Sequence, residues 1–259
     1  MADLLRITDL RAGYGGADVL RGVSFALQRG EVCALLGENG SGKTTLLRAA
    51  CGLLPHRGSC LLGGQEVQTL SDRERARRIG WLSQRGGVSL SLSGLDVVLM
   101  GFNPLLGALQ YPTREQRGHA LAVMEELGAA EFAHRDFTAL SAGQKQLVLF
   151  ARTLVRDVAL LVLDEPDGAL DFRRRRFLFE LLRRRAAERS CGVLLCSHDI
   201  NAALRWADRL LLLRDGELCG DVDMRDTSKP ALEAALRAAY GELELIEHSG
   251  RYLMTEVGI

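Results

Sequence analysis

Short apolar runs recur along the chain and predict a sheet that is buried on both faces. The runs VCALL, ALLVL, GVLLC and RLLLL are each short and continuous. Such runs are typical of parallel strands that are covered by helices on both sides. From Glu31 onward they alternate with segments of helical periodicity, which indicates an α/β domain built around a parallel sheet.

The beginning and the middle of the chain follow different patterns. Residues 4–27 alternate apolar and polar positions around a glycine cluster at residues 13–16, which predicts antiparallel strands joined by turns. Residues 85–140 lack strand-like runs, and the sequence PTREQRGHALAVMEELG has apolar residues at helical spacing. The apolar residues at this spacing are Leu121, Met124 and Leu127, and we therefore expect a helical insertion.

The end of the chain predicts one more helix and a hairpin. A helix is expected to begin at Ser228 with Pro230 in its first turn, and two alternating runs then flank the tripeptide SGR. The whole chain is expected to form a single domain. Its parts are a nucleotide-binding core of residues 1–85 and 158–235, a helical subdomain of residues 86–157 and a C-terminal extension of residues 236–259.

Composition removes several classes of protein. The 259 residues include 33 Lys plus Arg and 33 Asp plus Glu, so the neutral chain is unlike a general nucleic-acid binder. No apolar run approaches the roughly 18 residues that a membrane helix needs. The first residues, MADLLRITDL, lack the basic and apolar regions of a secretory signal. We expect a cytoplasmic protein of ordinary globular composition.

The six cysteines predict structure rather than chemistry. No two of them form a C-x-x-C pair, so metal-ligand spacing is absent. Cys33 and Cys196 lie within apolar segments, where a free thiol behaves as a small core residue. We expect the cysteines to be buried and reduced.

An arginine-rich helix is expected over residues 172–189. Nucleic acid or lipid could bind such a helix. However, Phe177, Leu178, Leu181 and Leu182 form one apolar face, so the pattern favours arginines on a solvated outer face.

The segment GENGSGKT, residues 37–44, carries the strongest chemical signal. It fits G-x-x-x-x-G-K-[ST] and follows the strand-like run VCALL. Glycines allow backbone N–H groups to cradle phosphate oxygens, and the following helix adds its positive end. Lys43 would reach the β- and γ-phosphates, and the Thr44 hydroxyl would bind Mg²⁺. The nucleotide-binding residues expected here are Gly37, Glu38, Asn39, Gly40, Ser41, Gly42, Lys43, Thr44 and Thr45.

A second signal is the pair of acids at the end of the run ALLVL. Open α/β sheets bind ligands at the carboxyl ends of their strands, which is where Asp164 and Glu165 fall. Asp164 fits a carboxylate that holds Mg²⁺, and Glu165 fits a base that polarises the attacking water.

A third signal, LSAGQ, leads to a family. Ser141 and Gln144 form a capping box, which by itself predicts only the start of a helix. Placed 23 residues before Asp164, however, LSAGQ resembles the signature motif of ATP-binding cassette proteins. The resemblance covers nearly the whole chain. It implies that Ser141, Ala142, Gly143 and Gln144 contact nucleotide.

The resemblance also implies roles for residues whose local sequence is uninformative. Tyr14 resembles the aromatic residue that stacks on adenine. Gln84 in WLSQ resembles the glutamine that senses Mg²⁺ and the γ-phosphate. Asp171 in GALD lies in the loop that meets a partner subunit, and His198 in SHD resembles the switch histidine that contacts the γ-phosphate. Glu165, His198 and Gln84 are thus expected to be catalytic, and Thr44, Gln84 and Asp164 to hold the metal.

The sequence departs from the family pattern at a few positions. Ala142 stands where the signature usually has its second glycine, and Gly168 replaces a small polar residue. Asp167 stands where the family commonly has Thr, and it adds a third acid near Asp164 and Glu165. These departures bear on the rate of turnover.

The fold implied by the resemblance is a three-layer α/β P-loop NTPase core with an N-terminal antiparallel β-subdomain and an inserted helical subdomain. The implied function is ATP hydrolysis, with Mg²⁺, that energises a membrane importer. The stretch DVVLMGFNPLLGALQYPT and the segment GQKQLVLFARTLV most resemble the branch that serves iron–siderophore, haem and cobalamin importers, although Phe102 stands where that branch often has Arg.

The implied partners are a second copy of the chain in an ATP-sandwich dimer, two transmembrane permease subunits and, indirectly, a periplasmic or lipoprotein substrate-binding protein. No nucleic acid is expected. The subunit is expected at the cytoplasmic face of the membrane. The surface around Gln84 and the helical insertion, including Phe102 and Leu105, is expected to dock a permease helix.

Other interpretations stay open. A soluble cassette ATPase of DNA repair would need a long coiled-coil or zinc insertion, yet Gln84 and Ser141 are only 57 positions apart. A translation-associated cassette protein would normally carry each motif twice. Glu165 and His198 argue against a non-catalytic nucleotide-binding module, and an importer for another substrate is a further alternative.

Overall fold

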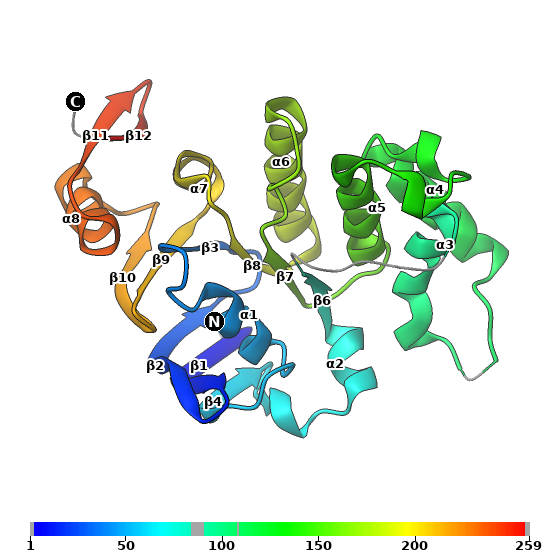
Figure 1. The fold of residues 1–259 in the computed structure, drawn as a ribbon, viewed down its shortest axis with the longest axis horizontal. Helices are drawn as coiled ribbons and strands as arrows, with labels where there is room; N and C mark the ends of the chain where they lie inside the picture. The colour runs from blue at the N-terminus through cyan, green and yellow to red at the C-terminus, as the bar shows by residue number, and fades with distance from the viewer. Residues whose placement is uncertain (1–2, 84–90, 108, 257–259) are drawn as a thin grey trace.

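The computed structural model describes residues 3–83, 91–107 and 109–256 (Figure 1). A central sheet of parallel strands has helices along it, with a smaller antiparallel sheet below and a group of helices to one side. Among the described residues no helix is both long and apolar enough to cross a membrane.

The central sheet is built from the apolar runs that predicted it. Its strand order is β10-β9-β3-β8-β7-β6, and all neighbours are parallel except β10, which runs antiparallel to β9. The strands β3, β7, β8 and β9 correspond to the apolar runs VCALL, ALLVL, GVLLC and RLLLL. The other two strands are β10, which forms a hairpin with β9, and β6. The strands are β3 (Val32–Leu36), β6 (Ile79–Leu82), β7 (Leu160–Asp164), β8 (Gly192–Cys196), β9 (Arg209–Arg214) and β10 (Glu217–Asp223).

Successive residues of β3 enter two separate cores. Cys33 and Leu35 pack with α1 and the N-terminal sheet, whereas Val32, Ala34 and Leu36 pack with the helices of the opposite face. This alternation follows from the two-residue period of a strand, and it explains why the run is apolar throughout. The three-layer α/β fold expected from the sequence is therefore correct.

The N-terminal sheet is antiparallel, as predicted, with the strand order β2-β1-β4-β5. Gly15 and Gly16 both have positive φ in the turn between its first two strands, where residues with side chains would be strained. The strands are β1 (Leu5–Tyr14), β2 (Ala17–Leu27), β4 (Arg57–Leu62) and β5 (Gln65–Glu66), and the helix α1 (Lys43–Ala50) packs between this sheet and the central one.

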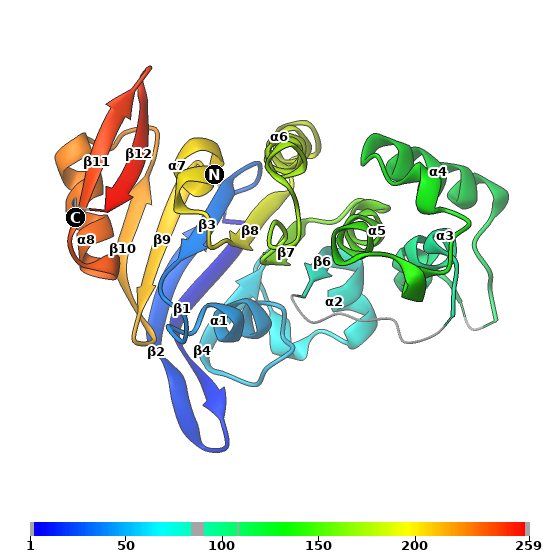
Figure 2. The ribbon, with the colours of Figure 1, turned by 45° about the horizontal axis from the view of Figure 1, so that its top comes forward.

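The predicted insertion is helical and lies beyond the β6 edge of the central sheet (Figure 2). Of the apolar residues at helical spacing, Met124 and Leu127 are buried, whereas Leu121 on α4 is 37% exposed. The helices after β5 are η1 (Val67–Thr69), α2 (Asp72–Arg78), α3 (Gly94–Leu99), η2 (Met100–Leu105), α4 (Arg114–Glu126), η3 (Ala130–Phe132), η4 (Phe137–Ala139) and α5 (Ala142–Leu154).

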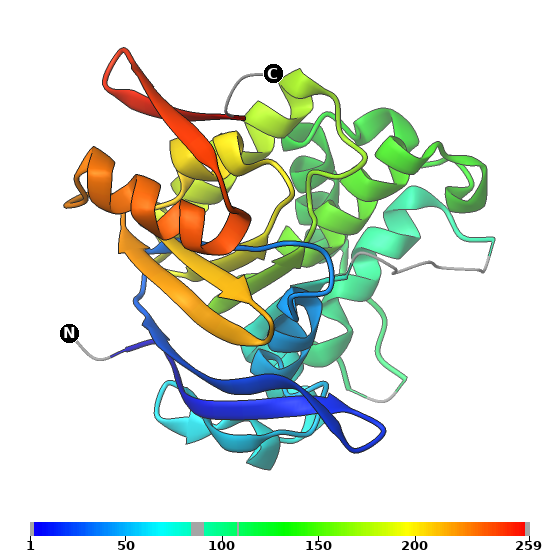
Figure 3. The ribbon, with the colours of Figure 1, turned by 60° about the vertical axis from the view of Figure 1, so that its left-hand side comes forward.

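The chain ends in a helix and a projecting hairpin (Figure 3). Ser228 caps α8 (Lys229–Tyr240), and β11 (Leu243–His248) pairs with β12 (Arg251–Glu256) around the predicted turn. The division expected at residues 235/236 falls within α8. The Asn201 side chain, from α7 (Ile200–Trp206), holds β12 by accepting from the Met254 N–H at 2.7 Å and donating to the Met254 carbonyl at 3.2 Å.

The arginine-rich helix α6 (Phe172–Arg189) joins parts of the molecule as well as meeting solvent. Arg185 is 9% exposed and pairs with Glu126 of α4 at 2.5 Å, and Arg184 pairs with the same carboxylate. Arg185 is therefore an exception to the expectation that the arginines lie mostly on a solvated outer face. Phe177 also departs from the predicted apolar face, since it is 39% exposed.

The prediction that all six cysteines are buried fails at one position. All six are free thiols, and five are buried, but Cys219 on the edge strand β10 is exposed.

Candidate functional site

Three loops that carry the predicted chemistry leave the same edge of the central sheet. The strands β3, β8 and β7 are neighbours and parallel, so their carboxyl ends lie side by side (Figure 1). The glycine-rich loop follows β3, and His198 lies just after β8. Asp164 is the last residue of β7, and Glu165 is the residue after it. This arrangement is the ligand-binding edge of an open α/β sheet.

The glycine-rich loop has a backbone that only glycine adopts readily. Gly37, Gly40 and Gly42 have φ angles of 153°, 85° and 107°. A Cβ atom at Gly37 would lie 2.1 Å from the Leu213 carbonyl oxygen, so the loop also packs too closely to β9 for any side chain there. Residues with such φ angles can turn successive N–H groups toward one point, which forms an anion cradle at the start of α1.

Lys43 lies in this cradle. Its side chain is folded back, and Nζ donates to the Gly37 carbonyl at 2.8 Å and to the Glu38 carbonyl at 2.9 Å. The residue is only 7% exposed, and the Ser41 hydroxyl beside it is buried without a hydrogen-bond partner among the described residues. A buried ammonium and an unpaired buried hydroxyl in a glycine-rich loop at the start of a helix fit a bound polyphosphate.

Thr44 and Asp164 bring two hard oxygen ligands together. The Thr44 hydroxyl lies 3.2 Å from Asp164 Oδ1, and Asp164 is 1% exposed. A hydroxyl and a carboxylate in contact beside a phosphate cradle are the donor set that Mg²⁺ prefers. The residues present therefore fit the expected metal. Gln84, the third expected ligand, lies outside the described residues.

Cys196 is a neighbour of this pair that sequence reasoning did not assign. The register between β7 and β8 places Cys196 opposite Asp164, and its Sγ donates to Asp164 Oδ1 at 2.8 Å. Burial raises the pKa of the Cys196 thiol well above its usual value, so the group stays a protonated donor. The only sequence signal was the end of an apolar run, which gives no register.

Glu165 and His198 are in direct contact. His198 Nε2 lies 2.6 Å from Glu165 Oε1, and the Glu165 backbone N–H donates to the Cys196 carbonyl at 3.1 Å. Glu165 has φ of 51°, an uncommon value for a residue with a side chain and one that concentrates at functional sites. The strand pairing of β7 with β8 thus brings together two residues that are 33 positions apart.

The LSAGQ segment forms a helix start with exposed donors. The Ser141 N–H donates to Gln144 Oε1 at 2.9 Å, and the Gln144 N–H donates to Ser141 Oγ at 3.4 Å, which completes the predicted capping box. Ser141 and Ala142 are exposed, so the methyl group of Ala142 faces solvent. A Cβ atom at Gly143 would lie 2.8 Å from the Ala169 carbonyl, which accounts for the glycine.

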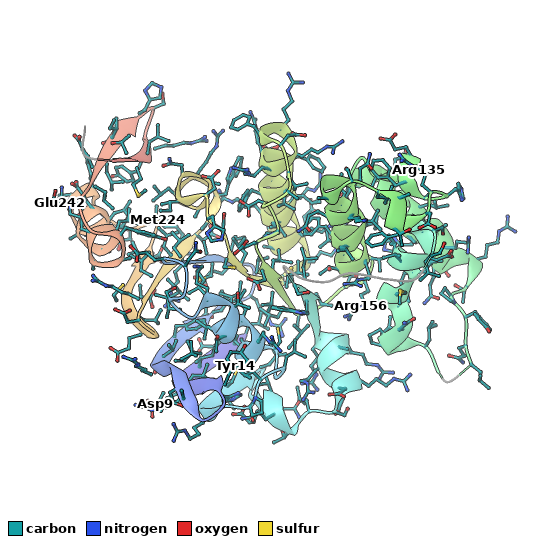
Figure 4. All side chains as sticks on the ribbon, viewed as in Figure 1. Asp9, Tyr14, Arg135, Arg156, Met224 and Glu242 are labelled. Atoms are coloured by element: carbon teal, nitrogen blue, oxygen red, sulfur yellow. The ribbon has the colours of Figure 1, made fainter. Side chains whose placement is uncertain are left out.

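Two further predicted residues lie on other elements. Tyr14, at the end of β1 (Figure 4), is 48% exposed. The Arg48 guanidinium lies 5.8 Å from its ring centroid. Sequence reasoning did not identify Arg48, although it adds positive charge beside the surface expected to receive adenine. Asp171 caps α6 by accepting from the Arg174 N–H at 3.0 Å, and its side chain is 62% exposed.

Asp167, the third acid expected near Asp164 and Glu165, is buried. It is 4% exposed, and its Oδ2 accepts from the Ser197 hydroxyl at 2.8 Å. It nevertheless borders the same cavity as Glu165 and His198, which has a volume of about 530 Å³.

Residues 20–168 match the family described as ABC transporter, which is more than half of the chain. The chain belongs to the ABC transporter family. As a member of this family it is an ATP hydrolase, and ATP is its nucleotide.

Full-length similarity places the chain near importer subunits of this family. It is 38% identical to the hemin import ATP-binding protein HmuV of Bordetella pertussis, over 94% of this chain and 95% of the relative. It is 34% identical to the cobalamin import ATP-binding protein BtuD of Halobacterium salinarum, over 83% of this chain and 54% of that relative.

Solved structures of cassettes share the fold. A putative metal-chelate type ABC transporter in an inward-facing conformation aligns with a TM-score of 0.78 and 25% identity, over 98% of this chain and 96% of that chain. A dimeric ATP-binding cassette in a post-hydrolysis state, bound to ADP and Pi, aligns with a TM-score of 0.79 and 26% identity, over 86% of this chain and all of that chain.

Proposed function

We propose that this chain is the ATP-hydrolysing subunit of a membrane importer for an iron chelate, haem or cobalamin, and that it acts at the cytoplasmic face of the membrane. The observation that carries the proposal is the similarity to a hemin import subunit over nearly the full length of both chains. The family match alone covers residues 20–168, whereas this similarity covers 94% of the chain and 95% of the hemin import subunit.

Nucleotide binding is assigned to the cradle and to the residues around it. In this assignment the loop N–H groups and Lys43 hold the phosphates, and Tyr14 stacks on adenine. The two carbonyls that now accept from Lys43 Nζ lie in the same loop, so the ammonium can exchange them for phosphate oxygens without leaving its place. Thr44, Asp164 and Gln84 would hold Mg²⁺, which neutralises phosphate charge when bound.

Proton transfer is assigned to Glu165. Its side chain is 16% exposed and lies at the cavity, so its carboxylate can meet a water molecule there. The contact with His198 Nε2 orients the carboxylate at the cavity, where it would take a proton from the attacking water. His198 thus positions the base and, at 50% exposure, also has ring surface toward the site.

A second copy of the chain and two permease subunits are the proposed partners, with a substrate-binding protein acting through the permease. The helix α5, whose first residues Ser141 and Ala142 are exposed, packs on the face of the central sheet opposite α1 (Figures 1 and 2). The signature donors of one chain therefore suit the nucleotide of another chain better than their own.

A groove beside the helical insertion is the proposed permease site. It has a volume of about 330 Å³, and its lining residues come mainly from β6, η2 and α5. Arg156, just after α5, is one of them (Figure 4). Trp81, Met100 and Asn103 also line it. The expected docking residue Phe102 is 5% exposed and packs in the core, so that expectation is wrong. Leu105 is 45% exposed and stays a candidate.

A matched pair of substitutions tests this proposal. Met100→Asp in the groove is expected to abolish association with the permease subunits, because the new carboxylate would have to lose its water in the contact. Leu121→Asp on α4 is the control, since both residues are 37% exposed and only Met100 lines the groove. Each tagged variant would be co-expressed with the permease subunits of a hemin importer and purified from detergent-solubilised membranes.

The two substitutions separate the possible outcomes. Loss of the permease with Met100→Asp alone, with unchanged basal ATP hydrolysis, supports the groove. Equal retention by both variants would place the docking surface elsewhere. If the unsubstituted chain copurifies with no multi-span protein and does not stimulate uptake, the importer assignment itself fails.

A further inference from the structure

A buried cluster of polar side chains joins the loop after Glu165 to the loop that carries His198. Ser197, which is 2% exposed, donates to Asp167 Oδ2 at 2.8 Å and accepts from the Asp199 N–H at 3.0 Å. Asp199 in turn caps α7, where its Oδ1 accepts from the Ala202 N–H at 2.9 Å. Both chain neighbours of His198 are therefore held by side-chain hydrogen bonds.

Arg175 of α6 bridges the two loops. Its Nη1 donates to Asp199 Oδ2 at 2.7 Å, and its Nη2 donates to the Leu170 carbonyl at 3.4 Å. Its Nε lies 3.9 Å from Asp167 Oδ2. One guanidinium thus contacts the segment after Glu165 and the segment after His198 at the same time, in a planar fork that a lysine cannot reproduce.

The charges in the cluster depend on one another. Burial raises the pKa of Asp167, while the Ser197 hydroxyl and the Arg175 charge oppose that rise. A buried carboxylate is costly unless it is paired and hydrogen-bonded, and Arg175 supplies the charge for both Asp167 and Asp199. Asp167, which stands where the family commonly has Thr, therefore contacts Ser197 and lies beside Arg175.

We infer that Asp167 and Arg175 are positioning residues that hold His198 against Glu165. This inference rests on the proposed roles of Glu165 and His198. The imidazole is half exposed, so its packing does little to fix it. Its place against Glu165 depends on the loop backbone at Ser197 and Asp199, and that backbone is anchored through Asp167 and Arg175. A catalytic group displaced by about 1 Å can lose up to about 10²-fold in rate.

Arg175→Gln tests the bridge. The substitution keeps a polar side chain but removes the charge and the fork. We expect kcat for ATP hydrolysis to fall by about 10- to 100-fold, with the Kd for ATP unchanged, because the cluster does not include the phosphate cradle. Arg176→Gln is the matched control, since Arg176 is the next residue of α6 and pairs with Glu180 at 2.8 Å outside the cluster. That control is expected to keep its kcat.

A double-substitution cycle with His198→Ala distinguishes positioning from general loosening of the fold. If Arg175 acts through His198, then Arg175→Gln will lower the rate little further once His198 is gone. Single-turnover hydrolysis with enzyme in excess over ATP would measure these low rates. Additive losses, or a normal kcat for Arg175→Gln, would overturn the inference.

Asp167→Asn provides a second route to the same answer. The amide can still accept from Ser197 but no longer attracts Arg175, so a smaller fall in kcat is expected with the same dependence on His198. If Arg175→Gln does not fold, the Asp167→Asn variant still tests the inference. The proposed roles of Glu165 and His198 would fail separately, by normal turnover in His198→Ala and Glu165→Gln.

Discussion

Replacing Glu165 with glutamine is expected to lower ATP hydrolysis by about 10²- to 10⁴-fold while ATP binding survives. Glutamine has the size of glutamate but cannot accept a proton from the attacking water. The backbone that holds residue 165 is fixed by its hydrogen bond to the Cys196 carbonyl, so the substitution should leave the loop in place. Phosphate release and the binding of a fluorescent ATP analogue would be measured on the same preparations.

Lys43→Ala is the contrasting variant in this experiment. It removes charge-assisted hydrogen bonds to phosphate that are worth about 1.5–3 kcal/mol each, so it should weaken ATP binding itself. Unchanged turnover in Glu165→Gln would remove Glu165 from the role of base. Equal ATP affinity in Lys43→Ala and the unsubstituted chain would contradict the phosphate assignment of the glycine-rich loop.

Much of the fold could be predicted because a strand buried on both faces has a continuous apolar sequence, which is a local pattern. The runs around Cys33 and Leu194 are apolar at every position, since alternate residues enter two different cores. The helix start at Ser228 was equally predictable, because capping depends on residues that are close in sequence. The burial of Arg185 was not predictable, because its partner Glu126 lies on α4 and no local pattern links the two helices.

The candidate site likewise has a part that local sequence predicts and a part that depends on how the strands pair. The positive φ angles of Gly37, Gly40 and Gly42 require glycine, so the loop leaves a spacing that can be recognised in the sequence. The contact of Cys196 with Asp164 arises from the order and register of β7 and β8, and a single sequence specifies neither. Phe102 was misplaced for a related reason, because an apolar residue in a predicted helix suits a docking surface and a core equally well.

An ATP-dependent dimer is the other large effect that we expect. The start of α5 presents Ser141, the N–H groups near Gly143 and a helix dipole equivalent to about +0.5 charge, which together form a second phosphate-binding device. The chain already has a phosphate cradle at Lys43. We therefore expect the start of α5 to bind the γ-phosphate held by the partner chain.

The free energies place such a dimer near the limit of stability. If each signature supplies two charge-assisted hydrogen bonds of about 1.5–3 kcal/mol, two interfacial sites give roughly 6–12 kcal/mol. Association costs about 4–15 kcal/mol in lost translational and rotational freedom. Because these ranges overlap, pairing should require the γ-phosphate and should end once that phosphate is cleaved and released. Hydrolysis would then drive a cycle of closing and opening.

Sedimentation of the Glu165→Gln protein would measure this dependence, with ATP and Mg²⁺ in one sample and ADP in another. A dimer is expected only with ATP, and the further substitution Ser141→Arg should abolish it by placing a long side chain where the phosphate must dock. Thr113→Arg is the matched control, because Thr113 also begins a helix with a complete capping box and is also exposed. Both substitutions remove one helix cap, so their costs in stability should be similar. A dimer that persists in ADP, or one that Thr113→Arg disrupts as strongly as Ser141→Arg, would show that the signature does not bind the partner's nucleotide.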